Sequence, residues 1–284
     1  MKGPPVTTVE FLLETYDVFL LDAYGVLVNS NGALPGAAAF LEALESRNKT
    51  YWLLSNDASR SVATSWSRYT AFGLPLRADR ILTSGSLLPS YFRQNNLLGA
   101  RCLVLGTDDS RAYVEAAGGI VCPYDDATAT VCVLADDMGF PFLEAMNDVV
   151  SVLLARLENA KPTHLILPNP DLVFPRDGGF GITAGAMAVA VEAVLKLRDP
   201  SGQQRFVPLG KPHPPLFEEA LVRLGNRRDK SRMIMLGDQL MTDVLGAAHF
   251  GIDSALLLTG VSRASEVAHA PKAPTFLLPS LQEG

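Results

Sequence analysis

Residues 18–28, VFLLDAYGVLV, contain the segment that decides the fold. The apolar residues Val18 to Leu21 run without a break into Asp22, and such a run predicts a strand buried on both faces, as in a parallel sheet. Asp22 then lies at the C-terminal end of that strand, where open α/β sheets bind their ligands. Gly25 predicts a sharp departure of the backbone, because glycine adopts dihedral angles that other residues resist. Taken alone, the segment allows two interpretations, a turn-forming aspartate and a catalytic acid.

The composition limits the classes of protein to which the chain can belong. It has 284 residues, 48% of them hydrophobic, enough for one large domain or two smaller ones. Its 24 basic and 30 acidic residues give a net charge of −6, which argues against a nucleic-acid partner. The three cysteines have no C-x-x-C spacing, which favours reduced thiols in a reducing compartment. No signal peptide and no run of roughly 18 apolar residues is found. These features predict a soluble, cytoplasmic protein without membrane contact.

Strand and helix patterns alternate along nearly the whole chain, which predicts an α/β fold with a parallel sheet. We assign residues 1–84 to the first part of a core domain. Residues 85–204 repeat the strand–helix theme and are predicted to form a second, smaller α/β domain. Residues 205–284 are predicted to complete the core. The second domain is therefore expected to be an insertion into the first.

Chemically active residues follow the predicted strands of the core. Asp22 ends the first strand, Ser55 and Asn56 end the second, and Gly237-Asp238 follow the apolar strand 233–236. Lys211 lies just past a further predicted strand, 206–209. Because parallel strands joined by helices end at one edge of the sheet, we expect these side chains to converge. This convergence is the main argument for a functional site.

The residue types in this set predict phosphate chemistry. Asp22 and Asp238 offer the hard oxygen ligands that suit Mg²⁺, and a cation between them would offset their mutual repulsion. Lys211 is a compact positive charge that can hold phosphate, and the Ser55 hydroxyl can hydrogen-bond a phosphate oxygen. An aspartate that faces bound phosphate can attack phosphorus and form an aspartyl-phosphate.

The ordered motifs resemble those of the haloacid dehalogenase-like (HAD) hydrolase superfamily. Asp22, Ser55, Lys211 and Gly237-Asp238 with Asp243 are similar to its four sequence motifs. The large insert between Ser55 and Lys211 resembles class IIA, the 4-nitrophenylphosphatase and sugar-phosphatase branch. Four segments carry the similarity to this branch: Leu34-Pro35-Gly36-Ala37, Ser55-Asn56-Asp57-Ala58-Ser59-Arg60, Asn169-Pro170-Asp171 and Gly210-Lys211-Pro212.

The resemblance implies a Rossmann-like core with an inserted α/β cap domain. It implies that Asp22 is the nucleophile and a Mg²⁺ ligand, that Asp238 ligates Mg²⁺ and that Asp243 supports that shell. Tyr24 would contribute its backbone carbonyl to the metal. The phosphoryl group would be bound by Ser55 and Lys211, and the neighbouring Asn56 is predicted to bind substrate with them.

The resemblance also bears on substrate and assembly. Asn169 and Asp171 are similar to a family loop and are predicted to contact substrate. The substrate would be a small phosphorylated metabolite, and class IIA relatives often form homodimers through their caps.

Tyr24 departs from the superfamily's Asp-x-Asp motif, whose second aspartate protonates the leaving group. A general acid contributes roughly 10²–10⁴-fold to the rate. Its absence predicts a slow phosphatase that prefers aryl or acyl phosphates. The Tyr24 hydroxyl and Asp57 are candidate replacement acids, although Asp57 is better explained as a cap of the following helix.

Two alternative functions follow from the same departure. The first is a phospho-ligand binding or regulatory protein that has lost catalysis. The second is a metal-independent 2-haloacid dehalogenase, because Asp-Ala-Tyr-Gly of this chain resembles the first motif of those enzymes. The metal-binding pattern at Asp238 and Asp243 argues against this alternative. Among other acidic residues, the pairs 108–109, 125–126 and 136–137 are interpreted as solvated caps at turns and helix starts.

Overall fold

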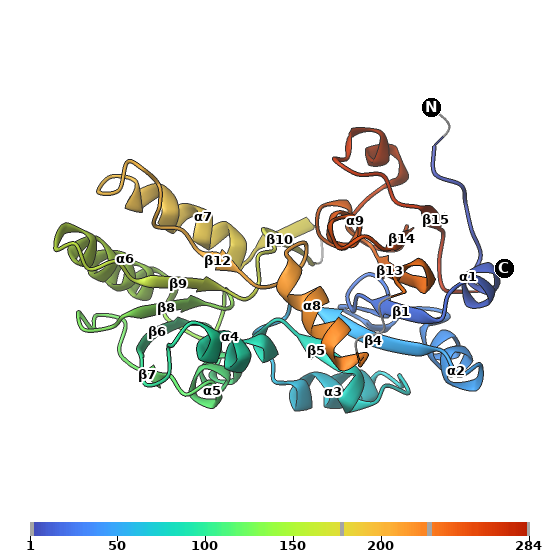
Figure 1. The fold of residues 1–284 in the computed structure, drawn as a ribbon, viewed down its shortest axis with the longest axis horizontal. Coiled ribbons are helices and arrows are strands. Elements are labelled where there is room, and N and C mark those ends of the chain that lie inside the picture. The colour runs from blue at the N-terminus through green and yellow to red at the C-terminus, as the bar shows by residue number, and fades with distance from the viewer. Residues whose placement is uncertain (1–2, 177–178, 226–228, 283–284) are drawn as a thin grey trace. The chain divides into compact units, whose positions relative to one another are not determined.

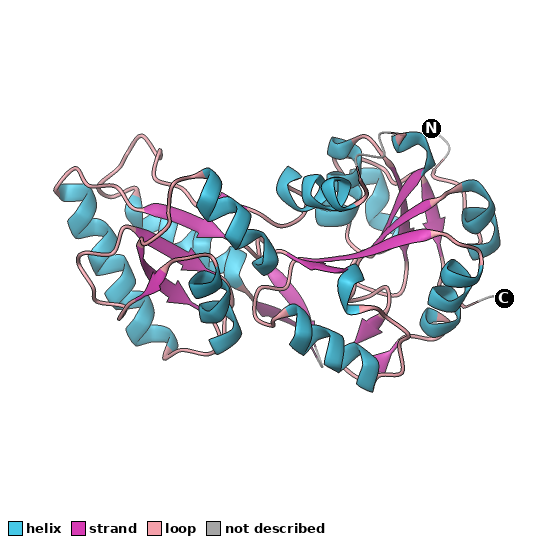
Figure 2. Ribbon diagram, turned by 60° about the horizontal axis from the view of Figure 1, so that its bottom comes forward, coloured by secondary structure: helices cyan, strands magenta, loops and turns pink. Residues whose placement is uncertain are grey.

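The computed structural model describes residues 3–176, 179–225 and 229–282, and the chain divides into two compact units (Figure 1). Unit 1 comprises Met1–Ser55, Val62–Leu82 and Lys211–Gly284. Unit 2 comprises Asn56–Ser61 and Thr83–Gly210. Each unit has its own parallel sheet, and in Figure 2 helices flank the strands of both.

Unit 1 contains, among the described residues, a six-stranded sheet in the order β15-β14-β13-β1-β4-β5. β1 lies inside it and pairs in parallel with β13 on one side and β4 on the other. Its strands are β1 Val18–Leu21, β4 Thr50–Ser55, β5 Ile81–Thr83, β13 Met233–Gly237, β14 Asp253–Leu257 and β15 Phe276–Leu278, and a separate hairpin joins β2 Val28–Asn29 to β3 Gly32–Ala33. The helices are α1 Val9–Thr15, α2 Ala37–Ser46, α3 Val62–Ala71, α8 Pro214–Arg223 and α9 Leu245–Phe250, with 3₁₀ turns η1 Ala78–Arg80, η3 Lys230–Arg232 and η5 Ala264–His269 and a π-helical turn η4 Leu240–Val244.

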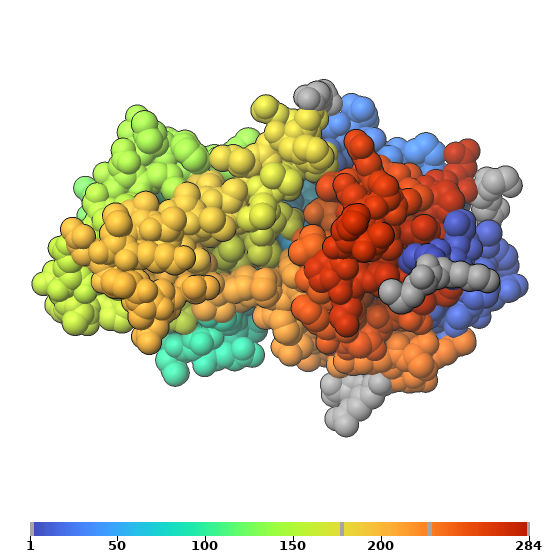
Figure 3. Space-filling view, turned by 90° about the horizontal axis from the view of Figure 1, so that it is seen from above, coloured from blue at the N-terminus to red at the C-terminus, as the bar shows by residue number. Residues whose placement is uncertain are grey.

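All four residues of β1 are buried, as the apolar run predicts for an interior parallel strand. Phe19 and Leu21 belong to a core that α2 covers with Phe40 and Leu41. α2 begins at Ala37, because Gly36 adopts a left-handed conformation (φ +83°) at its N-cap. The two ends of the chain meet in this unit, since β15 pairs with the N-terminal segment through hydrogen bonds of Leu277 with Pro5 and Thr7. Figure 3 shows these blue and red segments side by side.

Unit 2 contains, within the described ranges, a five-stranded sheet in the order β12-β9-β8-β6-β7, whose pairs are all parallel. Its strands are β6 Arg101–Leu105, β7 Ile120–Val121, β8 Val131–Leu134, β9 His164–Leu167 and β12 Val207–Pro208, with a hairpin of β10 Val173–Arg176 and β11 Gly179–Ile182. The helices are α4 Leu88–Gln94, α5 Asp108–Ala116, α6 Phe142–Glu158 and α7 Ala184–Leu195, after a 3₁₀ turn η2 Gly85–Leu87. α6 buries Val149, Val152 and Leu153 on one face.

The unit boundaries differ from the predicted domain limits in three places, the smallest difference being that unit 2 resumes at Thr83 rather than at residue 85. The predicted return to the core at residue 205 comes too early, because β12 adds to the sheet of unit 2 by pairing with β9. Residues 56–61, predicted to continue the core after Ser55, group instead with unit 2. The physical reason is a set of hydrogen bonds between this loop and α5.

Among the described residues, no helix has the length and apolar character needed to cross a bilayer.

Candidate active site

Asp22 follows β1 directly and is nearly buried, with 7% of its surface exposed. Its backbone N–H donates to Leu236 O at 2.9 Å, so the parallel ladder with β13 continues up to this residue. Three positions later Gly25 turns the chain with φ +78°, and a Cβ at this position would overlap the Asp238 carboxylate. Gly25 is therefore required both for the turn and for the close approach of Asp238.

Lys211 is only 2% exposed and bonds two of the predicted site carboxylates. Its Nζ lies 2.6 Å from Asp22 Oδ1 and 2.7 Å from Asp243 Oδ1. Burial by itself would lower the pKa of Lys211, but the charges of Asp22 and Asp243 outweigh burial and raise it. Lys211 therefore stays an ammonium group and partly neutralises the site.

Asp243 is positioned by the π-helical turn η4 rather than by a regular helix start. α9 begins at Leu245, and η4 directly precedes it. Gln239 N donates to Asp243 Oδ2 at 3.1 Å, and Gly237 leaves room for the side chain, since a Cβ there would overlap it. π-helical turns are often found at functional sites, and this one aims a carboxylate back toward β1.

Asp238 is completely buried and only partly satisfied. Its Oδ2 accepts from Val261 N at 2.7 Å, whereas its Oδ1 has no hydrogen-bond partner among the described residues. Burial raises the pKa of Asp238 well above its ordinary value, and the charges of Asp22 and Asp243 raise it further. A buried carboxylate oxygen without a partner is costly, so this atom is a candidate ligand of a cation.

The three carboxylates fit a divalent cation. Asp22, Asp238 and Asp243 each offer an oxygen, and these atoms lie within 4.8 Å of one another. One ammonium group, from Lys211, faces three acids, so the ionised cluster has excess negative charge. Hard oxygen donors in this number suit Mg²⁺, which completes its shell with water and substrate oxygens.

Sequence reasoning missed the loop that holds Asp238. Besides the Val261 contact, Ser262 N donates to Asp238 O at 3.0 Å, and Thr259 Oγ1 donates to Gly25 O at 2.6 Å. Gly260 has no side chain at the point where a Cβ would overlap Asp238. The sequence did contain one signal that could have identified this Thr-Gly-Val-Ser segment. The segment follows the strand β14, and the C-terminal end of β14 lies at the same sheet edge as Asp22.

Ser55 and Tyr24 complete the predicted residues of unit 1. Ser55 is the buried last residue of β4, and the pairing of Leu53 with Leu21 places it at the same sheet edge as Asp22. Tyr24 is half-buried, and its ring packs against the hydrophobic core of unit 1. The ring is thus held by core packing, and an acid role for the hydroxyl stays a prediction.

The remaining predicted substrate-binding residues lie together in unit 2. Asn56 Nδ2 donates to Asp171 Oδ1 at 2.9 Å, and Asp171 N donates to Asn169 Oδ1 at 3.0 Å. Gly210 packs against this set, since a Cβ there would lie 2.5 Å from Asn56 Oδ1. The three residues bond one another, and their contact with substrate stays a prediction.

Asp57, a candidate replacement acid, is engaged in its own loop. Its Oδ1 accepts from Ser59 N (2.8 Å) and Ser59 Oγ (2.7 Å), and its Oδ2 pairs with Arg60 Nη1 at 3.0 Å. These contacts engage both oxygens of the Asp57 carboxylate and close a turn, five residues before α3 begins.

The interpretation of all acidic pairs as solvated caps is wrong for Asp136. This residue follows β8, is 7% exposed and has an Oδ2 without a hydrogen-bond partner among the described residues. Burial, with the charges of Asp137 and Asp57, raises its pKa to about 7, although Arg60 acts in the opposite direction. Asp136 is therefore a buried acid.

Comparisons with known proteins agree with this fold. The profile of the family "Haloacid dehalogenase-like hydrolase" matches residues 19–119, and a HAD-hydrolase-like profile matches residues 208–284. Chronophin of Homo sapiens is 31% identical over an alignment of 265 residues that covers 87% of this chain and 82% of chronophin. Dihydroxyacetone phosphatase of Corynebacterium glutamicum is 25% identical over 265 residues, 93% of this chain and 89% of that protein. A solved HAD-superfamily structure from Cytophaga hutchinsonii has a TM-score of 0.86 and 30% identity and covers 99% of this chain and 100% of its own.

The matched segments contain the residues that the structure brings together. The first profile spans Asp22 and Ser55, and the second spans Lys211, Asp238 and Asp243. Relatives at 30% identity or more extend over most of the chain, including unit 2. The chain therefore belongs to the haloacid dehalogenase-like hydrolase superfamily, in its class IIA branch, and is a phosphatase-type hydrolase.

Proposed function

We propose that the chain hydrolyses a small phosphorylated metabolite in a Mg²⁺-dependent reaction that passes through an aspartyl-phosphate on Asp22. The observation that carries the proposal is the buried arrangement of Lys211 between Asp22 and Asp243, beside an Asp238 Oδ1 that has no hydrogen-bond partner within the described part of the chain. A buried, incompletely satisfied charge cluster is expected where a protein binds a charged ligand.

The side chains divide the work as follows. An Asp22 oxygen attacks phosphorus, the bond from phosphorus to the leaving oxygen breaks, and its electron pair stays on that oxygen. Lys211 and Ser55 hold the phosphoryl oxygens. Water then attacks the aspartyl-phosphate, which releases phosphate and restores the Asp22 carboxylate.

Asp22, Asp238 and the Tyr24 backbone carbonyl would hold the Mg²⁺, with Asp243 in support. When bound, Mg²⁺ would supply positive charge that offsets the phosphate and carboxylate charges.

The leaving oxygen needs a proton unless its pKa is low. At the position of the usual acid stands Tyr24, whose ring packs against the core, so we propose a preference for aryl and acyl phosphates. The same packing favours the second candidate, a phospho-ligand binding protein with little turnover.

The test is a phosphate-release screen with Mg²⁺ on wild type, Tyr24→Asp and Tyr24→Asn. Wild type should release phosphate from 4-nitrophenyl phosphate, and EDTA or Asp22→Asn should abolish the release. Tyr24→Asp should raise turnover of alkyl phosphates by roughly 10- to 100-fold, while Tyr24→Asn, of equal size but without an acid, should not.

Each other result has a defined meaning. Mg²⁺-dependent phosphate binding without release supports the binding-protein alternative. Equal turnover of alkyl and aryl phosphates by wild type contradicts the leaving-group preference, and chloride release from 2-chloropropionate in EDTA supports a dehalogenase.

We also propose a cytoplasmic location and a homodimer formed through unit 2. Cys102, Cys122 and Cys132 are buried free thiols, as expected in a reducing compartment. The β10–β11 hairpin exposes Phe174, Phe180 and Ile182 to solvent. Cell fractionation tests the location, and sedimentation of wild type beside Phe180→Ser tests the dimer, which the variant should weaken.

A further inference from the structure

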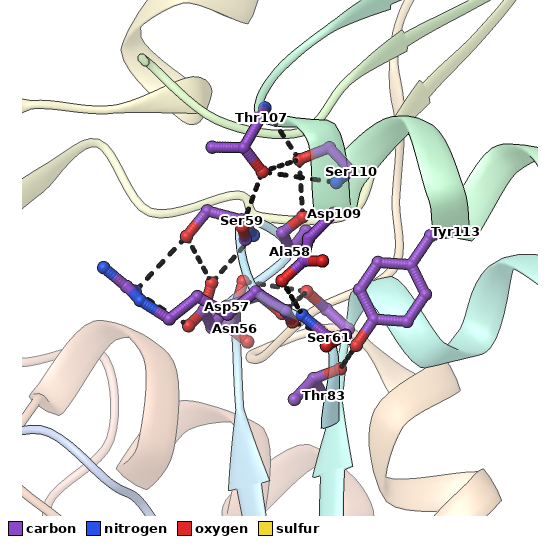
Figure 4. Close-up of polar contacts among 12 residues, drawn as sticks. Asn56, Asp57, Ala58, Ser59, Ser61, Thr83, Thr107, Asp109, Ser110 and Tyr113 are labelled. Atoms are coloured by element: carbon purple, nitrogen blue, oxygen red, sulfur yellow. Dashed lines mark hydrogen bonds and ion pairs between the residues drawn. The ribbon is translucent and has the colours of Figure 1, made fainter. Parts of the chain in front are cut away.

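Loop 56–61, which directly follows Ser55, is held through its backbone along its whole length (Figure 4). Each of its six residues has a main-chain group bonded to a residue 28 to 53 positions away in sequence. Asn56 O accepts from Ser84 Oγ (2.8 Å), Asp57 O from Gly85 N (3.4 Å), Ala58 O from Ser110 Oγ (2.7 Å), Ser59 O from Thr107 Oγ1 (2.5 Å) and Arg60 O from Tyr113 OH (3.0 Å), and Ser61 N donates to Asp109 Oδ2 (2.8 Å). We call the six partners the loop-binding cluster.

This arrangement is unusual for a connecting loop, whose backbone groups normally bond water. Ser84 and Ser110 of the loop-binding cluster are fully or almost fully buried, and so is Ala58 of the loop. Their carbonyl partners depend on protein hydroxyls, because a buried carbonyl that loses its donor pays its full desolvation cost. The cluster therefore specifies one conformation of the loop.

Tyr113 is the most constrained member of the cluster. Its hydroxyl also bonds Thr83 Oγ1 at 2.9 Å, so it links β5 to the loop. Gly85 packs against its ring, since a Cβ there would lie 2.6 Å from the ring and 3.2 Å from Ala58 Cα. The tyrosine, the glycine and the loop thus fit together without spare volume.

The loop is covalently continuous with the phosphate-binding residues. Ser55 precedes it without a spacer, and Asn56 is its first residue, held both at its carbonyl by Ser84 and at its side chain by Asp171. We propose that Thr107 and Tyr113 are positioning residues, which fix loop 56–61 and through it the phosphate-binding side chains of Ser55 and Asn56.

The inference rests on the proposed function, because it assigns the cluster to the binding of the phosphoryl group. Under the proposed function, the loop acts on the substrate only through groups that bind the phosphoryl group, and these groups bind it in the ground state as well as in the transition state. A loosened loop should therefore weaken phosphate binding uniformly, which raises KM with little change in kcat.

The main experiment compares Tyr113→Phe with Tyr91→Phe in the full chain. Both remove one hydroxyl from unit 2, but the Tyr91 hydroxyl bonds His164 Nε2 (2.7 Å) and not the loop. Tyr113→Phe should raise the KM for 4-nitrophenyl phosphate and the inhibition constant of inorganic phosphate about three- to tenfold, with kcat within about twofold. Tyr91→Phe should leave all three constants unchanged.

A second pair tests the other positioning residue. Thr107→Val removes the donor to Ser59 O and the N-cap of α5, whereas Thr107→Ser keeps the hydroxyl and should restore the wild-type constants. Thermal melts of all four variants separate lost stability from lost positioning. Lower melting temperatures with unchanged KM and phosphate inhibition in Tyr113→Phe and Thr107→Val would overturn the inference.

Other results would contradict the proposed function without contradicting the positioning role. If wild type binds inorganic phosphate in calorimetry but releases none from esters, the turnover proposal is wrong, and the phosphate affinities of the same variants still decide the positioning role. A wild type with neither release nor phosphate affinity would contradict both.

Discussion

The carboxylate–lysine site of unit 1 and the loop-binding cluster of unit 2 are both buried and polar, but they differ in how completely their groups are paired. In the cluster, four hydroxyls and one backbone N–H donate to loop carbonyls, the Asp109 carboxylate accepts from Ser61 N, and each residue of the loop has a partner. In the site, one ammonium group faces three acids, and an oxygen of Asp238 has no partner among the described residues. The paired region stabilises one conformation, and the underpaired region is prepared for a ligand.

The largest effect should come from making the site still less paired. Lys211→Met keeps the side-chain length but leaves Asp22 and Asp243 uncompensated, which should cost roughly 3–5 kcal/mol in the free energy of unfolding without metal and should abolish phosphate release. Urea unfolding measures the loss. Lys49→Met is the control, because Lys49 pairs with the half-exposed Asp17 and its loss should cost less than about 1 kcal/mol. Similar losses of unfolding free energy in the two variants would contradict the distinction between a buried charge cluster and a surface ion pair.

The next largest effect concerns the binding of Mg²⁺ to the three carboxylates. Mg²⁺ at about 100 times its dissociation constant should stabilise wild type by about 2.7 kcal/mol. Asp238→Asn should lose this gain, yet without Mg²⁺ it should be at least as stable as wild type, because it removes a repelling charge. Melting curves with Mg²⁺ and with EDTA check both statements. Asp136→Asn, which alters a buried acid of unit 2, should keep the Mg²⁺ gain, and its loss there would refute the assignment.

A smaller, pH-dependent effect should appear at Asp136. Its pKa rises from an ordinary value of 3.8 to about 7 in the folded protein, so the native state binds more protons than the unfolded state between these limits. The stability of wild type should therefore fall as the pH rises from about 4 to 7. Asp136→Asn removes this loss and should be more stable than wild type by about 1–3 kcal/mol above pH 7, with little difference near pH 4. Urea unfolding at pH 4, 6 and 8 gives the comparison, and parallel pH curves would show that Asp136 is not a buried acid.

The position of a residue at the sheet edge was predictable where the local sequence pattern depends directly on its place in the fold. An apolar run that ends in a polar residue marks an interior parallel strand, and this was sufficient for Asp22, Ser55 and Asp238. The same rule failed for β12, a short segment whose sheet is chosen by its distant partner β9. The β10–β11 hairpin was also missed, because its exposed strands contain Pro175 and glycines rather than an alternating pattern.

Burial of polar groups was the least predictable property. An acidic pair has the same sequence pattern at a solvated turn as at Asp136, and only the packing of residues distant in sequence distinguishes the two. Loop 56–61 likewise has the composition of an ordinary turn, which does not reveal that its backbone is bonded to distant residues. Its six backbone partners lie between positions 84 and 113, and no local signal connects them to the loop.

The separation in sequence between loop 56–61 and its backbone partners limits how such chains can be recombined with their relatives. A swap of residues 83–210 for the insert of a relative would remove every partner of the loop while leaving the loop itself behind. A functional chimera must therefore transfer two separate pieces, the long insert and the six-residue segment after Ser55, so the modular boundary of this protein is not a single stretch of sequence.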